Sequence, residues 1–341
     1  MMTSDVSRGQ LRVVMLYELD PQWKVEEQAE ADRATRHLGF ALRRQGFSVV
    51  FAPVTTPDLG TPLGVFSPEQ VVVFNWCEGI PGVSHGEALV AQFLESQNYT
   101  YTGSTAAVLE LSYDKPAIKR LLEAAGAPTP RWAVFDGPDI NGWCEFPAIV
   151  KLAREHFSVG IDAGSVVFNR DELARRVAQV TARYRQPALV EEFIDGREFH
   201  VPLWGNGTVE MLPAIEMDFG DIADARRRVC SYEAKFAPDS ADYHDVKTLM
   251  PAALSEEELA ELRRVTILAY NAAGCRDYGR VDVRLRDGVF HVLDVNPNAD
   301  MSVDASVALA AGEAGFCYGA LGSRLLEMAA ARHPQNLAPH Q

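Results

Sequence analysis

The stretch Tyr278–Ser302, YGRVDVRLRDGVFHVLDVNPNADMS, decides the fold of this chain. Its first part alternates apolar and polar residues, which predicts a strand with one apolar and one polar face. Asp287-Gly288 predicts a turn, and the following FHVLDVN predicts the returning strand of a hairpin. The polar residues of this hairpin include an arginine, two carboxylates and an amide, so we expect the chemistry of the chain to lie there.

The length of the loop decides which side chains of the hairpin share a face. A two-residue loop would put Asp282 and Asp294 on opposite faces, because a shift of one residue turns a strand over. A three-residue loop, with Gly288 in the left-handed conformation, would put them on the same face. We expect the three-residue loop and therefore a face that gathers both carboxylates.

Asn296 would join Asp282 and Asp294 on this face, where uncompensated anions repel each other and raise a pKa. A hard divalent cation removes that conflict. Two carboxylates and an amide oxygen, with room for water or phosphate oxygens, are typical of a magnesium site. Arg280 lies on the same face and can steady negative charge on a reacting carbonyl oxygen. The hairpin alone leaves open the alternative of a solvated polar strand face followed by an Asn-Pro turn.

This hairpin resembles the C-terminal motif of the D-alanine:D-alanine ligase family within the ATP-grasp superfamily. There a G-R-x-D segment and a hairpin precede E-x-N-x-x-P-G-M-T. The resemblance implies an α/β fold with α+β character in the C-terminal half, in which a parallel-sheet N-terminal domain precedes two domains that clamp ATP. It also implies that Asp282, Asp294 and Asn296 bind Mg²⁺ or Mn²⁺ and that Arg280 is catalytic.

Composition and charge limit the class of protein. The 341 residues are 47% hydrophobic and 23% charged, which is ordinary for a globular chain of two or three domains. A formal net charge of −15 argues against nucleic acid or an anionic membrane surface as a partner. Five scattered cysteines favour reduced thiols, and no run is long and apolar enough for a membrane span. We do not expect the polar first ten residues to act as a signal peptide. We expect a cytoplasmic protein with small-molecule substrates, with a homodimer as the default assembly.

Residues 1–110 predict a parallel βαβ domain. LRVVMLY and FSVVFAPV are typical of strands around a helix, and VVVFNWCEGIPGVSHGEALVAQFLES repeats the plan. Ligands collect at the carboxyl ends of parallel strands, so we expect the loops LYELDPQWKVEE and NWCEGIPGVSHGE to face a common cleft. Two further domains are expected at residues 111–197 and 198–330, followed by a tail at residues 331–341.

Three lysines match phosphate-binding positions of the family. YTGSTAAVLELSYDKPAIKRLLEAAGAPTP is close to the family's Y-T-G-S…D-K…G-[LVI]-P-T-P segment, whose lysine corresponds to Lys115. FPAIVKLAREHFSVGI resembles P-x-[IV]-V-K-P-x-x-x-G-S-S-x-G, whose lysine corresponds to Lys151. SYEAKFAP resembles Y-x-x-K-Y, and Lys235 matches its phosphate-binding and catalytic lysine.

VEEFIDGREF is the strongest single match to the family. The resemblance implies that Glu191 accepts a hydrogen bond from the adenine amino group and Glu198 from the ribose hydroxyls. It also implies that the backbone of Glu192, Phe193 and Ile194 reads the edge of the ring. Read as structure alone, the segment is an amphipathic strand with exposed acids.

The flexible loop after Lys151 departs from the family pattern. His156-Phe157 replaces Gly-Ser at the loop tip, while Ser158, to which the resemblance gives a catalytic position, and Gly160 remain. Phe157 cannot form the hydrogen bonds of the family serine. We therefore expect closure by packing and a different substrate beneath the loop.

The substrate-binding segments also differ. N-P-N-A-D-M-S replaces N-x-x-P-G-M-T, so Asp300 stands near Asp304, and two acids would repel a carboxylate and favour a cationic or neutral acceptor. The family's opening G-G-x-S-x-E loop is absent, and Glu27 is the nearest positional match. Further expected substrate contacts are Phe236, Tyr243 and His244.

These resemblances imply an ATP-dependent carboxylate–amine ligase. ATP phosphorylates a carboxylate, an amine attacks the acyl phosphate, and an amide, ADP and phosphate are released. One alternative is a ligase whose acceptor is not D-alanine, in a secondary-metabolite or dipeptide pathway. Another is a nucleotide-binding protein that no longer catalyses, for which the altered loop argues. No G-x-G-x-x-G follows the first strand, which argues against a dinucleotide-dependent oxidoreductase.

Overall fold

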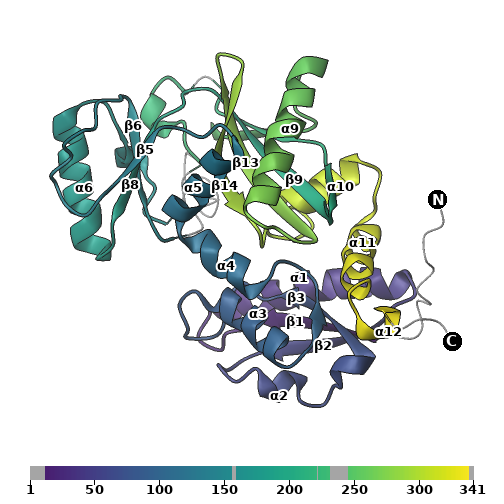
Figure 1. The fold of residues 1–341 in the computed structure, drawn as a ribbon. Helices are drawn as coiled ribbons and strands as arrows, with labels where there is room; N and C mark the ends of the chain where they lie inside the picture. Colours follow the sequence, from purple (N-terminus) through teal and green to yellow (C-terminus); the bar gives the residue numbers. More distant parts are fainter. Residues whose placement is uncertain (1–11, 156–158, 221, 231–244, 338–341) are drawn as a thin grey trace.

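The computed structural model describes residues 12–155, 159–220, 222–230 and 245–337. In these residues the strands form three sheets that follow one another along the chain. Figure 1 shows the first sheet below the third, and the second sheet to one side with α6 on its outer face. The expected combination of a parallel N-terminal sheet with two later sheets is confirmed.

The first sheet is parallel, with the strand order β2-β1-β3-β4. Its strands are apolar along most of their length because both faces are covered, by α1 and α11 on one side and by α2 and α3 on the other. The expected βαβ plan is therefore confirmed. Its elements are β1 (Arg12–Glu18), α1 (Val25–Arg44), β2 (Ser48–Val54), α2 (Gly60–Leu63), η1 (Pro68–Gln70), β3 (Val71–Trp76), α3 (Gly86–Ser96) and β4 (Thr100–Tyr101).

The second sheet is antiparallel, with the order β5-β8-β6-β7. Leu173, Val177 and Val180 of α6 pack on one of its faces, so the other face is left for the site described below. The elements of this part are α4 (Ala106–Tyr113), α5 (Lys115–Ala125), β5 (Trp132–Phe135), β6 (Ala148–Leu152), η2 (Ala163–Ser165), β7 (Val166–Val167), α6 (Arg170–Tyr184) and β8 (Ala188–Glu192).

The third sheet is also antiparallel, with the order β12-β11-β9-β13-β14 and β10 paired with β9. Apolar residues of β9 and β13 pack under α5 and α9, and the polar residues that alternate with them point to the opposite face. The elements are β9 (Arg197–Asn206), β10 (Thr208–Met211), β11 (Ile215–Asp218), η3 (Ala225–Arg227), β12 (Lys247–Leu249), α9 (Glu256–Ala272), β13 (Tyr278–Arg286), β14 (Val289–Asn296), α10 (Ser306–Glu313), α11 (Tyr318–Ala330) and α12 (Pro334–Leu337).

The loop of the β13–β14 hairpin has two residues. Arg286 pairs with Val289, and the two residues between them, Asp287 and Gly288, have φ angles of 52° and 77°. Left-handed conformations at both positions are typical of a type I′ turn. The expected three-residue loop is therefore wrong.

A β-bulge restores the expected face. Val283 pairs with Val292, whereas Asp282 pairs with Asp294, so Leu293 is an extra residue in β14. An extra residue turns the rest of the strand over. The expectation that the two carboxylates face one another is thus confirmed, although the extra residue lies in the strand and not in the loop.

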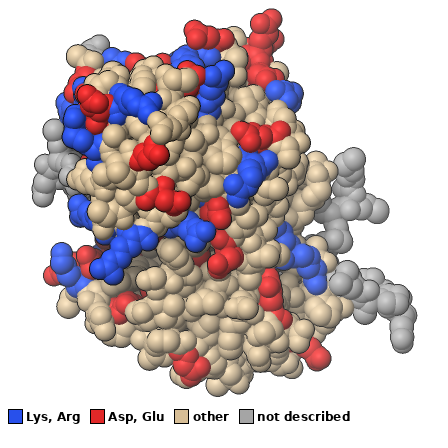
Figure 2. All heavy atoms as spheres, turned by 60° about the vertical axis from the view of Figure 1, so that its left-hand side comes forward, with Lys and Arg blue, Asp and Glu red and all other residues tan. Residues whose placement is uncertain are grey.

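Charges of both signs are spread over the surface. Figure 2 shows lysine and arginine mixed with aspartate and glutamate on one face of the molecule, without a continuous basic surface. This agrees with the formal net charge of −15. Among the described residues, no helix combines the length and the apolar character that crossing a membrane requires.

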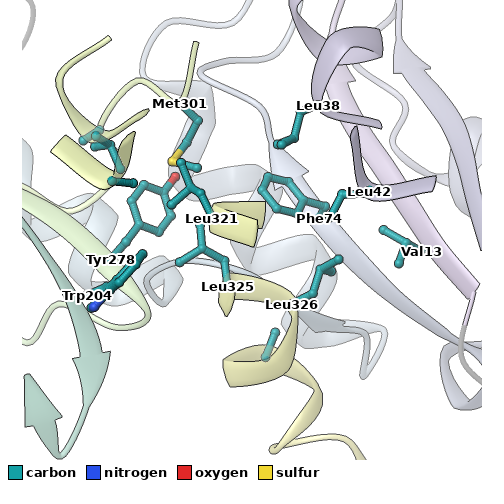
Figure 3. Close-up of a cluster of buried hydrophobic side chains, with 14 of the residues drawn as sticks. Val13, Leu38, Leu42, Phe74, Trp204, Tyr278, Met301, Leu321, Leu325 and Leu326 are labelled. Atoms are coloured by element: carbon teal, nitrogen blue, oxygen red, sulfur yellow. The ribbon is translucent and has the colours of Figure 1, made fainter. Parts of the chain in front are cut away.

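The C-terminal helices return to the first sheet. Gly322 of α11 lies against Leu38 and Leu42 of α1. Figure 3 shows one buried cluster that contains these two leucines together with Trp204 of β9 and Tyr278 of β13, so the first and third sheets share a core. We propose the domains 1–110, 111–197 and 198–330, because each contains one sheet apart from the first residue of β9.

Candidate active site

A pocket with about 810 Å³ of empty space lies between the second and third sheets. Most residues predicted to bind nucleotide or metal line it. They are Lys115, Lys151, Glu191, Glu192, Phe193, Ile194, Glu198, Asp282 and Asp294.

Two cations pair with the two carboxylates of the hairpin. Arg280 donates to both oxygens of Asp282, from Nε at 2.7 Å and from Nη2 at 2.9 Å. Lys115, at the start of α5, places Nζ 2.5 Å from Oδ2 of Asp294. Burial by itself would lower the pKa of Arg280, but Asp282 and Asp294 raise it overall. This face is therefore balanced in charge.

The cap of α5 fixes the position of Lys115. Asp114 accepts the N–H of Ala117 at 2.8 Å, and Gly126 ends the helix in the left-handed conformation. The Asp-Lys-Pro sequence thus starts the helix where Lys115 reaches across to the third sheet. The helix runs from Lys115 to Ala125.

The donor set of the hairpin fits a hard divalent cation. Asp282 lies opposite Asp294, and Arg280 lies opposite Asn296 in the same ladder. The Asn296 side chain accepts the N–H of Asn298 at 3.0 Å, and an amide oxygen has a second lone pair. Two carboxylates and an amide suit Mg²⁺ or Mn²⁺. Asn296 itself stands outside the residues that line the pocket.

A buried carboxylate holds two lysines beneath the pocket. Glu191 of β8 has 0% of its surface exposed and forms ion pairs with Lys119 of α5 and, at 2.5 Å, with Lys151 of β6. Burial alone would raise the pKa of Glu191, but the two ammonium groups lower it. Lys119 also donates to Thr129 and to the carbonyl of Val292. Both oxygens of Glu191 thus have a lysine partner, and its expected role as an acceptor for adenine stays a prediction.

Lys119 was not among the predicted site residues. It follows Lys115 by four residues, so both side chains lie on the same side of α5. That spacing could have predicted that Lys119 lies near the site. It could not predict that Lys119 pairs with the buried Glu191 on β8.

Glu198 of β9 is held by an arginine that the sequence analysis also left out. Arg284 donates from Nε to Oε2 of Glu198 at 2.8 Å and from Nη1 to the carbonyl of Ile194 at 2.8 Å. Burial by itself would raise the pKa of Glu198, but Arg284 holds it below its usual range. Arg284 follows Asp282 by two residues on β13, so the two side chains point to the same face of the strand. This alternation could have predicted that Arg284 lies at the site.

The segment after β8 uses part of its backbone within the protein. The N–H of Glu192 donates to the carbonyl of Arg131 at 2.8 Å, and the N–H of Phe193 donates to that of Pro147 at 2.9 Å. The Ile194 carbonyl accepts from Arg284. The two N–H groups are not available to a base, whereas the Ile194 carbonyl keeps a second lone pair. The backbone groups left to read a ring edge are therefore the carbonyls and the N–H of Ile194.

Three predicted substrate residues are described, and none of them lines the pocket. Glu27 lies in the first turn of α1, where its carboxylate accepts the N–H of Lys24 at 3.0 Å. Asp300 accepts the N–H of Ser302 at 2.8 Å, and Asp304 is exposed. The remaining predictions lie outside the described residues. They are His156, Phe157, Ser158, Lys235, Phe236, Tyr243 and His244.

A second group of carboxylates lies at the carboxyl edge of the first sheet. Burial raises the pKa of Glu18, at the end of β1, to about 7, and that of Glu87, on α3, to about 7. Glu78 keeps an exposed surface. Its pKa is nevertheless raised to about 8, first by loss of water around the carboxyl group and then by the nearby Asp300, Glu87 and Glu18 carboxylates. These contacts bring the two loops together at this edge of the sheet, and the common cleft expected between them stays a prediction.

Asn298 connects this acidic cleft, defined by Glu18, Glu78, Glu87 and Asp300, to the hairpin. Its Nδ2 donates to Oε2 of Glu87 at 2.9 Å. Glu18, Glu78 and Glu87 were not among the predicted site residues. Their positions after parallel strands were the signal in the sequence.

Comparison with known proteins gives consistent results. The family model described as the C-terminus of D-Ala-D-Ala ligase matches residues 121–327. The chain is 35% identical to the uncharacterized protein y4sG of Sinorhizobium fredii, over 82% of this chain and 81% of that protein. It is 33% identical to the D-alanine–D-alanine ligase of a Marinomonas species, over 70% of this chain and 72% of the relative. For the ligase of Chromohalobacter salexigens, the identity is 35% over 69% and 70% of the two chains.

A solved structure shares the fold. The crystal structure of D-alanine–D-alanine ligase from Bacillus anthracis complexed with ATP superposes with a TM-score of 0.72. The alignment covers 95% of this chain and 99% of that chain, at 19% sequence identity. At that identity the likeness shows the fold alone.

Proposed function

The chain belongs to the D-alanine–D-alanine ligase family, and from this premise we propose that it is an ATP-dependent carboxylate–amine ligase. ATP phosphorylates a carboxylate, an amine attacks the acyl phosphate, and an amide, ADP and phosphate are released. The observation that carries the proposal is the pocket in which Lys115, Lys151, Asp282 and Asp294 converge. Cations for phosphate and oxygen donors for a metal thereby lie in one pocket.

The ion pairs of the pocket suit an exchange of partners. Lys115 is paired with Asp294, and Arg280 is paired with Asp282. Magnesium or manganese, when bound, shields the charge of the terminal phosphate. We assign Asp282, Asp294 and Asn296 to the metal, and we assign Lys115 to the phosphates once Asp294 has a new partner. Each carboxylate then keeps a positive neighbour throughout, which avoids an uncompensated buried charge.

Lys151 and Glu198 have complementary parts in holding the nucleotide. Glu191 fixes the ammonium of Lys151 at the base of the pocket, so that its charge is positioned before any phosphate arrives. Glu198 is similarly fixed by Arg284 and remains an acceptor for the ribose hydroxyls. We thus assign Glu191 to the positioning of Lys151, and Glu198 to the sugar.

Arg280 is assigned to the oxygen of the reacting carbonyl. Its guanidinium lies on the same face as both carboxylates and is kept charged by them. A fixed cation at that place stabilises the negative charge that develops when the amine attacks. Because Asp282 holds it at two points, its orientation costs little when the reaction occurs.

The acidic cleft favours an acceptor that is cationic or neutral. Glu18, Glu78 and Glu87 gather beside Asp300, and each of the three glutamates has a raised pKa. A carboxylate brought next to them would be repelled, whereas an ammonium group would relieve their mutual repulsion. We therefore propose an acceptor amine that carries further positive charge, in a pathway other than cell-wall synthesis from D-alanine alone.

ADP release from the purified protein tests this function. The assay contains ATP and Mg²⁺ with a panel of carboxylates and of amines that are anionic, zwitterionic or cationic. We expect ADP release that depends on both organic substrates and is fastest with cationic amines. Fast turnover with D-alanine as the sole substrate would contradict the acceptor class. ATP binding without ADP release on any pair would contradict the ligase itself.

A further inference from the structure

Three side chains that can bind metal meet in the wall of the pocket. Glu198 and His200 come from β9, and Cys230 comes from the segment after η3. A carboxylate oxygen, the imidazole and the thiol all lie within 4.8 Å of one another. Glu198 and Cys230 also line the pocket, so an ion can reach them from its interior. None of the three belongs to the magnesium face assigned above.

His200 supplies an independent sign that a ligand is missing. Its side chain is only 7% exposed, and its Nε2 has no hydrogen-bond partner among the described residues. That nitrogen lies 3.5 Å from Oε1 of Glu198 and 3.9 Å from Oδ2 of Asp282. Leaving a buried polar atom without a partner is unfavourable. An ion between Nε2 and the Glu198 carboxylate would remove that cost.

Glu198 is prepared to act as a ligand through one oxygen. Its Oε2 accepts from Arg284, and Oε1 is the oxygen that faces His200. The guanidinium of Arg284 holds the carboxylate in place through Oε2, at 2.8 Å. An oriented, ionised carboxylate beside an imidazole is a common pair of zinc ligands.

The chemistry of the three ligands separates this group from the magnesium face. Imidazole and thiolate are ligands for borderline-soft ions such as Zn²⁺ and Co²⁺, whereas the hairpin offers only oxygen. Three protein ligands leave a fourth position for water, which is usual for zinc sites that open into a pocket. Glu198, His200 and Cys230 therefore select a different class of ion than the oxygen ligands Asp282, Asp294 and Asn296 do.

We propose that Glu198, His200 and Cys230 form a binding site for a zinc-class divalent cation inside the pocket. On binding, the Cys230 thiol gives its proton to solvent and its sulfur becomes a ligand of the ion. One consequence depends on the function proposed above. Since Glu198 is assigned to the ribose, the ion and ATP exclude one another, and zinc inhibits the ligase at a site distinct from the catalytic magnesium.

Cobalt absorption tests the site directly. Co²⁺ is titrated into the full-length reduced protein without nucleotide or Mg²⁺, and the thiolate-to-cobalt charge-transfer band is recorded. We expect one equivalent to produce the band and Zn²⁺ to remove it. Cys230→Ser should abolish the band, and His200→Gln should weaken cobalt binding by at least about tenfold, since even loss of a second-shell partner costs that much.

Cys144→Ser is the matched control, because Cys144 is exposed and is not among the residues that line the pocket. This variant should keep the band. A wild-type protein without a charge-transfer band overturns the proposal, as does a band that survives in Cys230→Ser. Loss of the band in Cys144→Ser would also overturn it, since the thiolate would then lie elsewhere.

ATP affinity in the presence of zinc tests the consequence. We expect Zn²⁺ to weaken ATP binding by the wild type and to have little effect on Cys230→Ser, which controls for zinc bound by the nucleotide itself. Zinc binding through Cys230 that leaves ATP affinity unchanged would overturn the exclusion and the ribose assignment, and the ion site would stand. ATP binding without any cobalt binding would overturn the ion site and leave the ligase proposal intact.

Discussion

The pocket and the acidic cleft use charge in opposite ways. In the pocket, Asp294 and Glu191 are paired with lysines, and the pKa of Glu191 is lowered. In the cleft, Glu18 and Glu78 have a raised pKa, and no ion pair joins either of them to a lysine or arginine of the described residues. The pocket is thus balanced before an anionic ligand and its metal arrive. The glutamates of the cleft are disfavoured as anions, and a cationic ligand would stabilise their ionised form.

Removing the buried carboxylate of the pocket has the largest expected effect. Glu191→Gln leaves Lys119 and Lys151 without their buried counter-charge, which we expect to destabilise the fold by about 3–5 kcal/mol. Urea unfolding followed by circular dichroism measures this. Glu192→Gln is the control, because Glu192 pairs with Arg286 nearer the surface and should cost less than about 1 kcal/mol. Equal losses in the two variants would contradict the idea that the pocket depends on a buried clamp.

Replacing the arginine of the hairpin separates binding from chemistry. Arg280→Ala should lower turnover by about 100-fold to 1,000-fold, which is typical for loss of a group that stabilises an oxyanion. ATP affinity should change little, because the lysines remain. Steady-state ADP release and equilibrium binding of ATP measure the two quantities. Arg264→Ala, in an exposed pair on α9, should leave both unchanged. Turnover at the wild-type rate in Arg280→Ala would contradict the assigned role.

The sequence predicted the surroundings of Arg280 but not those of Glu191. Arg280 could be predicted because one strand carries the whole pattern of cation and carboxylates. The Glu191 clamp could not, because Lys119 reaches β8 only after α5 has packed between the second and third sheets. The sequence correctly placed Glu191 in the pocket. It could not show which lysines pair with Glu191, because those contacts depend on tertiary structure.

The hairpin shows a second limit of the sequence. The face shared by Asp282 and Asp294 was predicted, and the loop length that was meant to produce it was wrong. A bulge at Leu293 has no local signature of the kind that Asp287-Gly288 gives for a turn. The acidic cleft was missed as a group, since Glu18 and Glu78 are 60 residues apart and meet only through the parallel sheet.

The raised pKa of Glu87 in the cleft should make the stability of the protein depend on pH. Burial raises the pKa of Glu87 from its ordinary 4.5 to about 7, so the folded state binds more protons than the unfolded state between these values. Stability is therefore lost as the pH rises through that window. Glu87→Gln should remove the loss and stabilise the protein at pH 8 by up to about 3 kcal/mol, at about 1.36 kcal/mol per pKa unit. At pH 4 the difference should vanish.

Thermal unfolding at pH 4, 6 and 8 measures this effect. Glu110→Gln is the control, since Glu110 is exposed on α4 and lies outside the cleft. A Glu87→Gln variant that is no more stable than the wild type at pH 8 would contradict the raised pKa of Glu87.

The central claim is that the face formed by Asp282, Asp294 and Asn296 binds a metal that the nucleotide needs. Calorimetric titration of ADP, with and without Mg²⁺, tests it on the wild type and on Asp294→Asn. The account predicts that Mg²⁺ strengthens ADP binding by the wild type and that Asp294→Asn loses this dependence on the metal. Nucleotide binding that is equally tight with and without Mg²⁺, and unchanged in Asp294→Asn, would contradict it.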